Sequence, residues 1–114
     1  MTDAKKTRPE TGERAFAFLR LNERPPKPRS RGVTEIRGPY YTPVGPHYLA
    51  DLLGAMGAYV DTLKYAGGSF ALMARNAVRA LNEVCHEHEV EVSTGGFLEY
   101  VLTQRGDAVQ RYLE

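Results

Sequence analysis

Short β-branched runs alternate with longer amphipathic stretches along the chain after residue 32. Three runs, at residues 33–37, 60–66 and 90–94, have the composition of strands, and each is followed by glycine. After the first run, apolar residues recur at the three- and four-residue spacing of one helix face. This face is formed by Leu49, Leu52, Leu53, Met56 and Val60. The pattern therefore predicts strands that alternate with helices.

Two further helical stretches follow the second and third runs. The first has one face formed by Ala77, Val78, Leu81, Val84, Cys85 and His88. The second carries Phe97, Leu98, Val101 and Leu102. Pro46 suits the first turn of the earliest helix, because a missing N–H costs nothing there. Asp107, directly after Gly106, suits the N-cap of a last helix.

The spacing of the strands indicates how they pair. They begin near residues 33, 60 and 90, at intervals of 27 and 30 residues. Strand, helix and strand at that period is typical of βαβ units with parallel strands. Right-handed crossovers then place the loops that follow the strands at one edge of the sheet, where α/β proteins bind ligands. We therefore predict an α/β domain over residues 32–114.

This predicted sheet is incomplete by itself. Three parallel strands cannot close a barrel, and they leave both edges unpaired. The last helix reaches Glu114 without a Gly, Asn or Pro to end it. We expect a completing chain or a homo-oligomer to supply the remainder, or the sequence to be truncated. We also expect the isolated chain to associate through incompletely covered apolar residues, namely Val33, Ile36, Leu63 and Val92.

The charge divides into two blocks. Residues 1–31 carry nine Lys/Arg and four Asp/Glu, whereas residues 32–114 carry six and ten. The first block also contains Pro25-Pro26-Lys27-Pro28, which favours an extended conformation. We interpret residues 1–31 as an extended, flexible basic arm whose apolar patch at residues 15–21 docks on the domain. Nucleic-acid binding is the less favoured alternative, because the aromatic residues cluster instead of alternating with the basic ones.

Composition narrows the class and the location. The chain has 114 residues, of which 42% are apolar and 25% charged, as in ordinary globular domains. No apolar run is long enough to cross a membrane, so we expect no membrane partner. The single cysteine, Cys85, excludes an intramolecular disulfide and fits a reducing, cytoplasmic location.

Candidate ligand-binding side chains lie on the first two strands. The period-two rule puts Lys64 opposite Leu63 and Tyr65, and it puts Glu35 and Arg37 on one face of their strand. An ammonium at a barrel mouth can bind phosphate, sulfite or a carboxylate. Arg37 can hold an anion, and Glu35 a metal ion. The alternative is an internal ion network of Glu35, Arg37 and Lys64.

Two glycine-rich turns complete the candidate site. Gly67-Gly68-Ser69 and Thr94-Gly95-Gly96 follow the second and third strands. Such turns let backbone N–H groups approach an anion, although any tight turn can require glycine. Cys85-His86-Glu87-His88 is a weaker candidate for a metal site. Its two histidines diverge by about 200° on a helix, so we favour core packing of Cys85.

Three segments of the chain resemble a known family. They are residues 28–40, 57–69 and 90–96, of which the second reads Gly-Ala-Tyr-Val-Asp-Thr-Leu-Lys-Tyr-Ala-Gly-Gly-Ser. In this order they resemble the phosphosulfolactate synthase family, especially its plant heat-stress-associated branch, over about residues 24–114. The resemblance implies the first three βα units of a TIM (β/α)8 barrel. It also implies a lyase that adds sulfite to phosphoenolpyruvate with Mg²⁺, in coenzyme M biosynthesis.

The reaction that the resemblance implies, together with the strand positions, suggests roles for the candidate residues. Lys64, at the expected barrel mouth, is the catalytic candidate. Glu35 is a metal ligand or a polar anchor, and the archaeal enzymes carry Asp at the matching strand. The predicted substrate-binding set is Arg37, Gly68, Ser69, Thr94 and Gly95. The catalytic base and much of the metal site would come from later strands, so we expect no synthase activity from this chain alone. The alternative function is a non-catalytic stress-tolerance or interaction protein of the same fold.

Overall fold

The protein is described by a computed structural model over residues 13–38 and 45–114. It has a three-stranded parallel sheet in the order β1-β2-β3. The strands are β1 (Glu35–Arg37), β2 (Thr62–Lys64) and β3 (Glu91–Ser93). The predicted α/β class and parallel pairing are confirmed, and each strand lies inside its predicted run.

Helices follow each strand, as the apolar spacing predicts. They are α1 (Pro46–Met56), η2 (Gly57–Tyr59), η3 (Ser69–Leu72), α2 (Arg75–Glu87), α3 (Phe97–Val101) and α4 (Ala108–Leu113). Pro46 lies in the first turn of α1, as predicted. Asp107 precedes α4 at the N-cap, but its side chain makes no capping hydrogen bond. Residues 39–44, which include the end of the segment 28–40 that carries the family resemblance, lie outside the described residues.

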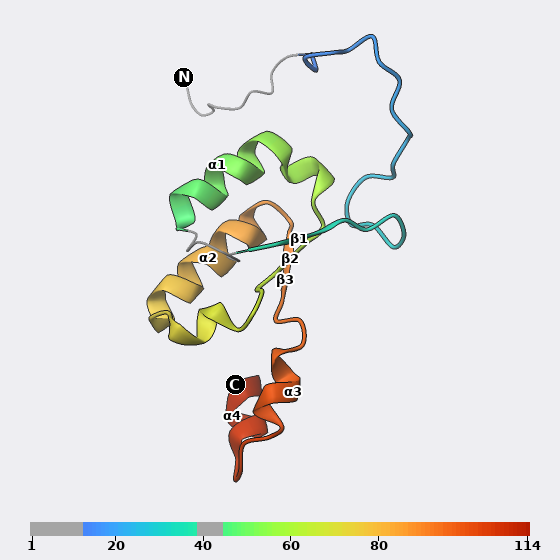
Figure 1. Cartoon of the computed structure of the whole chain (residues 1–114). Helices are drawn as coiled ribbons and strands as arrows, with labels where there is room; N and C mark the ends of the chain where they lie inside the picture. Colours follow the sequence, from blue (N-terminus) through green and yellow to red (C-terminus); the bar gives the residue numbers. More distant parts are fainter. Residues whose placement is uncertain (1–12, 39–44) are drawn as a thin grey trace.

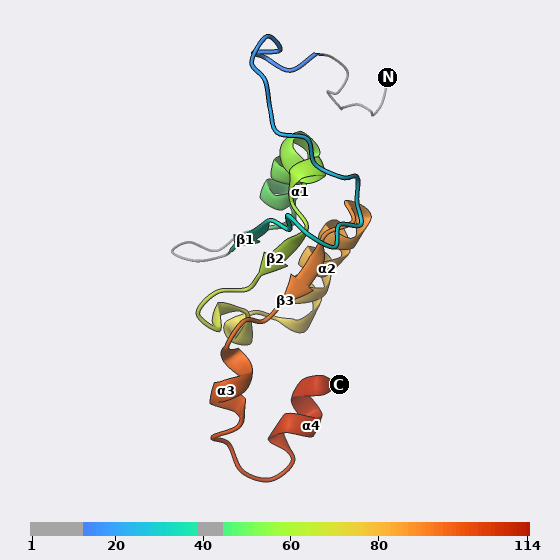
Figure 2. The ribbon, with the colours of Figure 1, turned by 90° about the vertical axis from the view of Figure 1, so that its right-hand side faces the viewer.

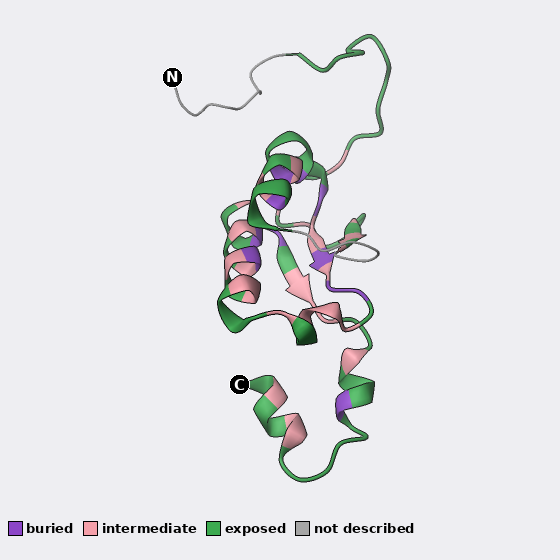
Figure 3. Cartoon of the chain, turned by 60° about the vertical axis from the view of Figure 1, so that its left-hand side comes forward, coloured by how far each residue is buried: buried purple, intermediate pink, exposed green. Residues whose placement is uncertain are grey.

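The core lies between the sheet and two helices. α1 and α2 run side by side on one face of the sheet (Figure 1), and each carries buried residues, which Figure 3 marks in purple. The buried cluster comprises Leu49, Leu53, Val60, Leu63, Tyr65, Leu81, Cys85 and Val90. Cys85 is fully buried, which agrees with its place on the apolar face of α2. Transfer of these side chains from water is what holds the two layers together.

No described helix covers the opposite face of the sheet. Figure 2 looks onto this face, with α1 and α2 behind the strands. Leu63 points toward the helices and is only 4% exposed, while Ile36 and Val92 pack partly against the core. Val33, before β1, is half exposed. The apolar side of the sheet is therefore well covered in the centre and less so at its two edges.

Residues 24–31 form a strap across the amino-terminal edge of the sheet. The Arg24 guanidinium donates to the carbonyl oxygens of Gly32 (2.9 Å) and Tyr59 (3.3 Å), and Lys27 Nζ donates to that of His88 (2.9 Å). The basic side chains of residues 24–31 thus bind backbone carbonyls of the domain, while the flexibility of the arm stays a prediction.

The apolar patch of the arm also differs from expectation. Phe16 and Phe18 contact each other at 6.3 Å between ring centroids, and both are exposed, by 62% and 81%. Leu19 and Leu21 are exposed as well. The patch therefore does not dock on the domain, and the basic residues of the strap make the contact instead.

The carboxyl-terminal helices extend away from the sheet (Figures 1 and 2). α3 and α4 pack on each other, and their link to the domain is aromatic. The ring of Phe97 lies 5.0 Å from that of Phe70 and 5.9 Å from that of Tyr112. Among the described helices, none is both long and apolar enough to cross a membrane.

Candidate functional site

A pocket of about 380 Å³ lies at the carboxyl-terminal edge of the sheet. It forms where β2 and β3 pass into their glycine-rich turns. Its lining residues are Arg37, Lys64, Tyr65, Ala66, Gly67, Gly68, Thr94, Gly96 and Phe97. Two cationic side chains and several backbone groups therefore meet beside an aromatic wall, which is a surface suited to a small anion.

The strand register explains why the two cationic residues meet. Arg37 pairs with Lys64, and Lys64 pairs with Ser93, so these three side chains form one row across the uncovered face. Two residues earlier, Glu35 pairs with Thr62, and Thr62 with Glu91. The uncovered face thus carries a positive row near the pocket and a negative row further from it.

Lys64 has no ion pair within the described part of the chain. The Glu35 carboxylate instead accepts a hydrogen bond from the Thr62 hydroxyl at 3.1 Å. The expected pairing of Lys64 with Glu35 is therefore not present in this structure. An ammonium at a half-buried position without a carboxylate partner keeps its charge available to a ligand.

The turns after β2 and β3 place backbone donors beside Lys64. Gly67 and Gly68 have φ values of 66° and 70°, a left-handed conformation that glycine adopts without strain. Among the described residues, the N–H groups of Gly67, Gly68 and Gly96 have no hydrogen-bond acceptor. Unpaired N–H groups that converge on a concave surface favour anions.

Side chains from the core and from α3 form the wall of the pocket. A Cβ at Gly68 would lie 2.8 Å from the Phe97 ring, so the aromatic ring packs directly on this turn. The Tyr65 hydroxyl donates to Asn82 Oδ1 at 2.7 Å, and burial raises the pKa of Tyr65 to about 12. Tyr65 is therefore protonated at neutral pH, and its hydroxyl is hydrogen-bonded to α2. Its role in the pocket is to form part of the lining.

The structure brings together four of the predicted site residues. Arg37, Lys64, Gly68 and Thr94 all line the pocket. Thr94 Oγ1 accepts a hydrogen bond from the Tyr112 hydroxyl, which ties α4 to this edge.

The other three predicted residues lie beside the pocket without lining it. Ser69 Oγ donates to the Ala66 carbonyl oxygen at 3.1 Å. Gly95 N–H donates to Ser93 Oγ at 3.0 Å, so it is not one of the unpaired donors. Glu35 lies in the negative row, two residues before Arg37 on the same strand. Their predicted roles in substrate or metal binding remain predictions.

The described residues do not fit a complete Mg²⁺ site. No group of three or more His, Cys, Asp or Glu side chains that could hold a metal ion occurs among them. Glu35 offers one carboxylate, and Mg²⁺ requires six oxygen ligands in octahedral geometry. His88 Nδ1 lies 2.9 Å from the Val84 carbonyl oxygen, and its neighbour Cys85 is buried in the core. We therefore derive no chemical step through a metal from these residues.

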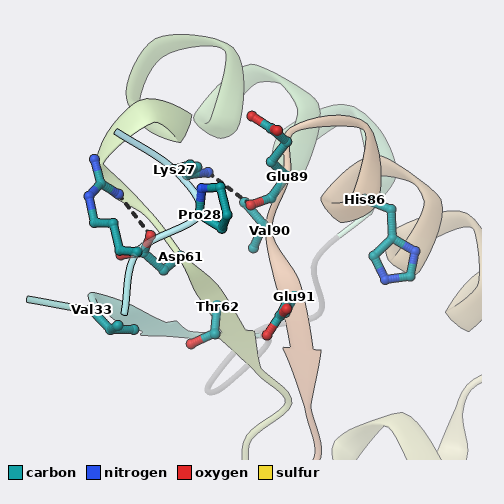
Figure 4. A pocket seen from close by; sticks show the side chains of 10 residues that line it. Lys27, Pro28, Val33, Asp61, Thr62, His86, Glu89, Val90 and Glu91 are labelled. Atoms are coloured by element: carbon teal, nitrogen blue, oxygen red, sulfur yellow. Dashed lines mark hydrogen bonds and ion pairs between the residues drawn. The ribbon is translucent and has the colours of Figure 1, made fainter. Parts of the chain in front are cut away.

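The sequence did not predict that Phe97 lines the pocket, because the spacing of its apolar neighbours indicates only one face of a helix. It also missed a second cavity, of about 320 Å³, at the amino-terminal edge (Figure 4). There Asp61 accepts hydrogen bonds from the Arg29 guanidinium and the Thr34 N–H, both at 2.8 Å. An acid directly before an apolar strand was the signal that could have revealed this anchor.

The anchor around Asp61 is electrostatically strong. Burial raises the pKa of Asp61, but the Thr34 N–H and the Arg29 guanidinium outweigh burial and hold this pKa below its usual 3.8. The side chains of Asp61 and Arg29 are only 10% and 6% exposed. Lys27 Nζ reaches across the same cavity to the carbonyl oxygen of Glu89 at 3.1 Å (Figure 4). The basic side chains of the strap therefore make structural contacts. At the opposite edge, the N–H groups of Gly67, Gly68 and Gly96 have no acceptor among the described residues.

Comparisons with known proteins give a consistent picture. The family model of (2R)-phospho-3-sulfolactate synthase (ComA) matches residues 22–114. Protein HEAT-STRESS-ASSOCIATED 32 of Arabidopsis thaliana is 40% identical over 98 residues, which cover 86% of this chain and 34% of the plant protein. Phosphosulfolactate synthase of Methanothermobacter thermautotrophicus is 30% identical over 102 residues, which cover 88% of this chain and 37% of that enzyme. The chain therefore spans about a third of the length of these curated relatives. No solved structure is significantly similar to it.

Proposed function

The chain belongs to the (2R)-phospho-3-sulfolactate synthase family, and we propose that it forms the phosphate-binding corner of a synthase-type active site. In this proposal, β1, β2 and β3 are the first three strands of a (β/α)8 barrel. Their consecutive order and the one-sided helix layer support that architecture. Barrel enzymes place their active sites at the carboxyl ends of the strands, which is the edge where the pocket lies.

The observation that carries the proposal is the meeting of Lys64 with two glycine turns around one pocket. The ammonium supplies a point charge, and the unpaired N–H groups supply directed hydrogen bonds. Arg37 lines the same pocket from β1, where a guanidinium can bind two phosphate oxygens together. Together these groups suit a phosphate monoester better than a neutral ligand.

We propose phosphoenolpyruvate and sulfite as the substrates. Addition of sulfite to the carbon–carbon double bond forms a C–S bond and puts one proton on the neighbouring carbon. The phosphate stays attached throughout, so the site must hold this group without cleaving it. Lys64, Arg37 and the turns would hold the phosphate and stabilise negative charge that develops beside it. The predicted Mg²⁺ would need ligands beyond Glu35.

A second candidate function rests on a different observation. The plant heat-stress-associated protein is 40% identical to the chain, whereas the archaeal synthase is 30% identical. A non-catalytic stress-tolerance or interaction protein would keep the fold without needing a competent anion site. Phosphate-ester binding at Lys64 therefore separates the two candidates.

The test is a titration of the full chain with phosphoenolpyruvate and with inorganic phosphate, followed by amide NMR shifts and thermal unfolding. We expect shifts at Gly67, Gly68 and Gly96, together with a raised unfolding temperature, since a ligand of the native state stabilises it. Lys64→Met should weaken binding by about tenfold. The control Lys27→Met removes a lysine from the opposite edge and should leave binding unchanged.

Two results would contradict the proposal. The first is binding that is equally strong in Lys64→Met and in the native sequence, and the second is no binding at all. Sulfite-dependent consumption of phosphoenolpyruvate tests the reaction itself. We expect none from this chain alone, because it spans about a third of the relatives' length.

A further inference from the structure

The side chain of Lys64 lies directly on the turn that follows β3. A Cβ placed at Gly95 would lie 2.7 Å from Lys64 Cε, 3.1 Å from Cδ and 3.3 Å from Cγ. Three successive carbons of the lysine stem therefore pass over this one glycine. The lysine stem therefore occupies the space that a side chain at position 95 would fill.

Two different features of Gly95 could explain a glycine here. Its φ is +60°, in the left-handed region, and its missing side chain leaves room for the lysine. Its N–H is already donated to Ser93 Oγ, so it offers no direct hydrogen bond to an anion. A left-handed φ alone does not bring this steric feature, because a Cβ at Gly106, where φ is +75°, would meet no atom within 4 Å.

We propose that Gly95 is a positioning residue for Lys64: the bare Cα of Gly95 holds the lysine stem so that its ammonium reaches the pocket. This inference rests on the proposed anion-binding role of Lys64. A Cβ at position 95 requires the Lys64 stem to move, because 2.7 Å is shorter than real Cβ contacts, and the flexible end of the lysine moves aside at small cost in stability. Rotation of the stem then removes the ammonium from the convergent N–H groups of the two turns.

The first experiment measures the contact in the ligand-free full chain. Gly95→Ala is compared in the native and Lys64→Ala backgrounds by urea unfolding, with Gly106→Ala as the control for backbone strain alone. We expect Gly95→Ala to shift the urea midpoint further than Gly106→Ala in the native background. In the Lys64→Ala background the two shifts should be equal, because the clash is gone. Equal shifts of Gly95→Ala in both backgrounds would overturn the proposal.

A second variant pair keeps the test valid if Gly95→Ala does not fold. Folding that is restored by the additional Lys64→Ala substitution supports the contact, and failure to restore it contradicts the contact. An NMR cross-peak between the Lys64 Hε and Gly95 Hα protons is expected in the native sequence. Its absence also overturns the proposal.

The last experiment tests whether the position of the Lys64 side chain affects anion binding, with inorganic phosphate as the probe. We expect Gly95→Ala to weaken phosphate binding about as much as Lys64→Ala, roughly tenfold, and the double variant to be no weaker than either. Gly106→Ala should bind like the native chain. If Lys64→Ala weakens binding and Gly95→Ala does not, the positioning role is wrong and the proposed function stands. If Lys64→Ala has no effect on binding, the proposed function itself fails.

Discussion

The two edges of the sheet use basic side chains for opposite purposes. At the amino-terminal edge, Arg24, Lys27 and Arg29 donate to carbonyl oxygens and to the Asp61 carboxylate. At the carboxyl-terminal edge, Lys64 has no partner among the described residues. The difference places the structural contacts of basic side chains at one end of the strands and the proposed ligand site at the other, which is the division that barrel proteins usually show.

The largest expected effect is at the amino-terminal edge. Asp61→Asn removes the charge that pairs with Arg29, and the Arg29 guanidinium, only 6% exposed, stays buried without it. Breaking one partner of such a buried pair costs on the order of 3 kcal/mol of unfolding free energy. Urea unfolding followed by circular dichroism measures this loss.

A matched variant tests whether the loss of unfolding free energy is specific to the amino-terminal edge of the sheet. Asp51→Asn changes an exposed acid on α1 and should alter the unfolding free energy very little. Cys85 supplies an independent readout, since it is fully buried and burial raises its pKa to about 11. Its thiol should react with iodoacetamide faster in Asp61→Asn than in Asp51→Asn. Equal rates would mean that Asp61 does not anchor the strap.

The same pair predicts a pH dependence. The pKa of Asp61 lies below its usual 3.8 in the folded chain, so its ionised form stabilises the fold above that value. This stabilisation is lost as the pH falls through the folded-state pKa. The difference in unfolding free energy between the native sequence and Asp61→Asn should be constant from neutral pH to about pH 5 and narrow below about pH 4. A difference that persists unchanged in stronger acid would contradict this.

A smaller effect is expected at Lys27. Its ammonium donates to the carbonyl oxygens of His88 and Glu89, at the carboxyl end of α2, where a positive charge is favourable. Lys27→Met should cost about 1 kcal/mol of unfolding free energy, measured in the same urea experiment. Phosphate binding should not change, and a change would mean that the two edges are coupled.

The smallest effect on stability is expected at Lys64. Lys64→Met removes no ion pair that the described residues make, so the unfolding free energy should change by less than about 0.5 kcal/mol. Comparison with Lys27→Met in urea measures this directly, since each variant loses one lysine. If Lys64→Met lowered the unfolding free energy as much as Lys27→Met, lysines at both edges would stabilise the fold equally, and the proposed difference between the edges would be wrong.

Local sequence signals were enough to predict the elements and their pairing. The apolar spacing around Leu49 and Leu81 located α1 and α2, because burial of one face fixes the period of a helix. The period-two rule placed Glu35 and Arg37 on one face of their strand and Lys64 on the opposite side of its strand from Leu63. The strand register then brings Arg37 and Lys64 into one row. These results depend on neighbours within one strand or helix, which the sequence displays directly.

Contacts between distant segments could not be predicted in the same way. Arg29 meets Asp61 across 32 residues, and nothing in a proline-rich basic segment identifies that partner. The path of Lys64 over Gly95 depends on how two turns approach each other, which glycine content alone does not determine. The rings of Phe16 and Phe18 are exposed instead of docked, whereas Arg24 in the strap donates to the Gly32 carbonyl oxygen.

The two charged rows on the uncovered face imply that anions and cations are attracted to different positions along the strands. Consecutive residues on one face of a strand are about 6.6 Å apart. A small anion that enters from the open end meets Arg37 and Lys64 first, and Glu35 and Glu91 would repel it from any deeper position. A cation is repelled by Arg37 and Lys64 and attracted by Glu35 and Glu91. The face therefore separates the two signs of charge into two neighbouring rows of side chains.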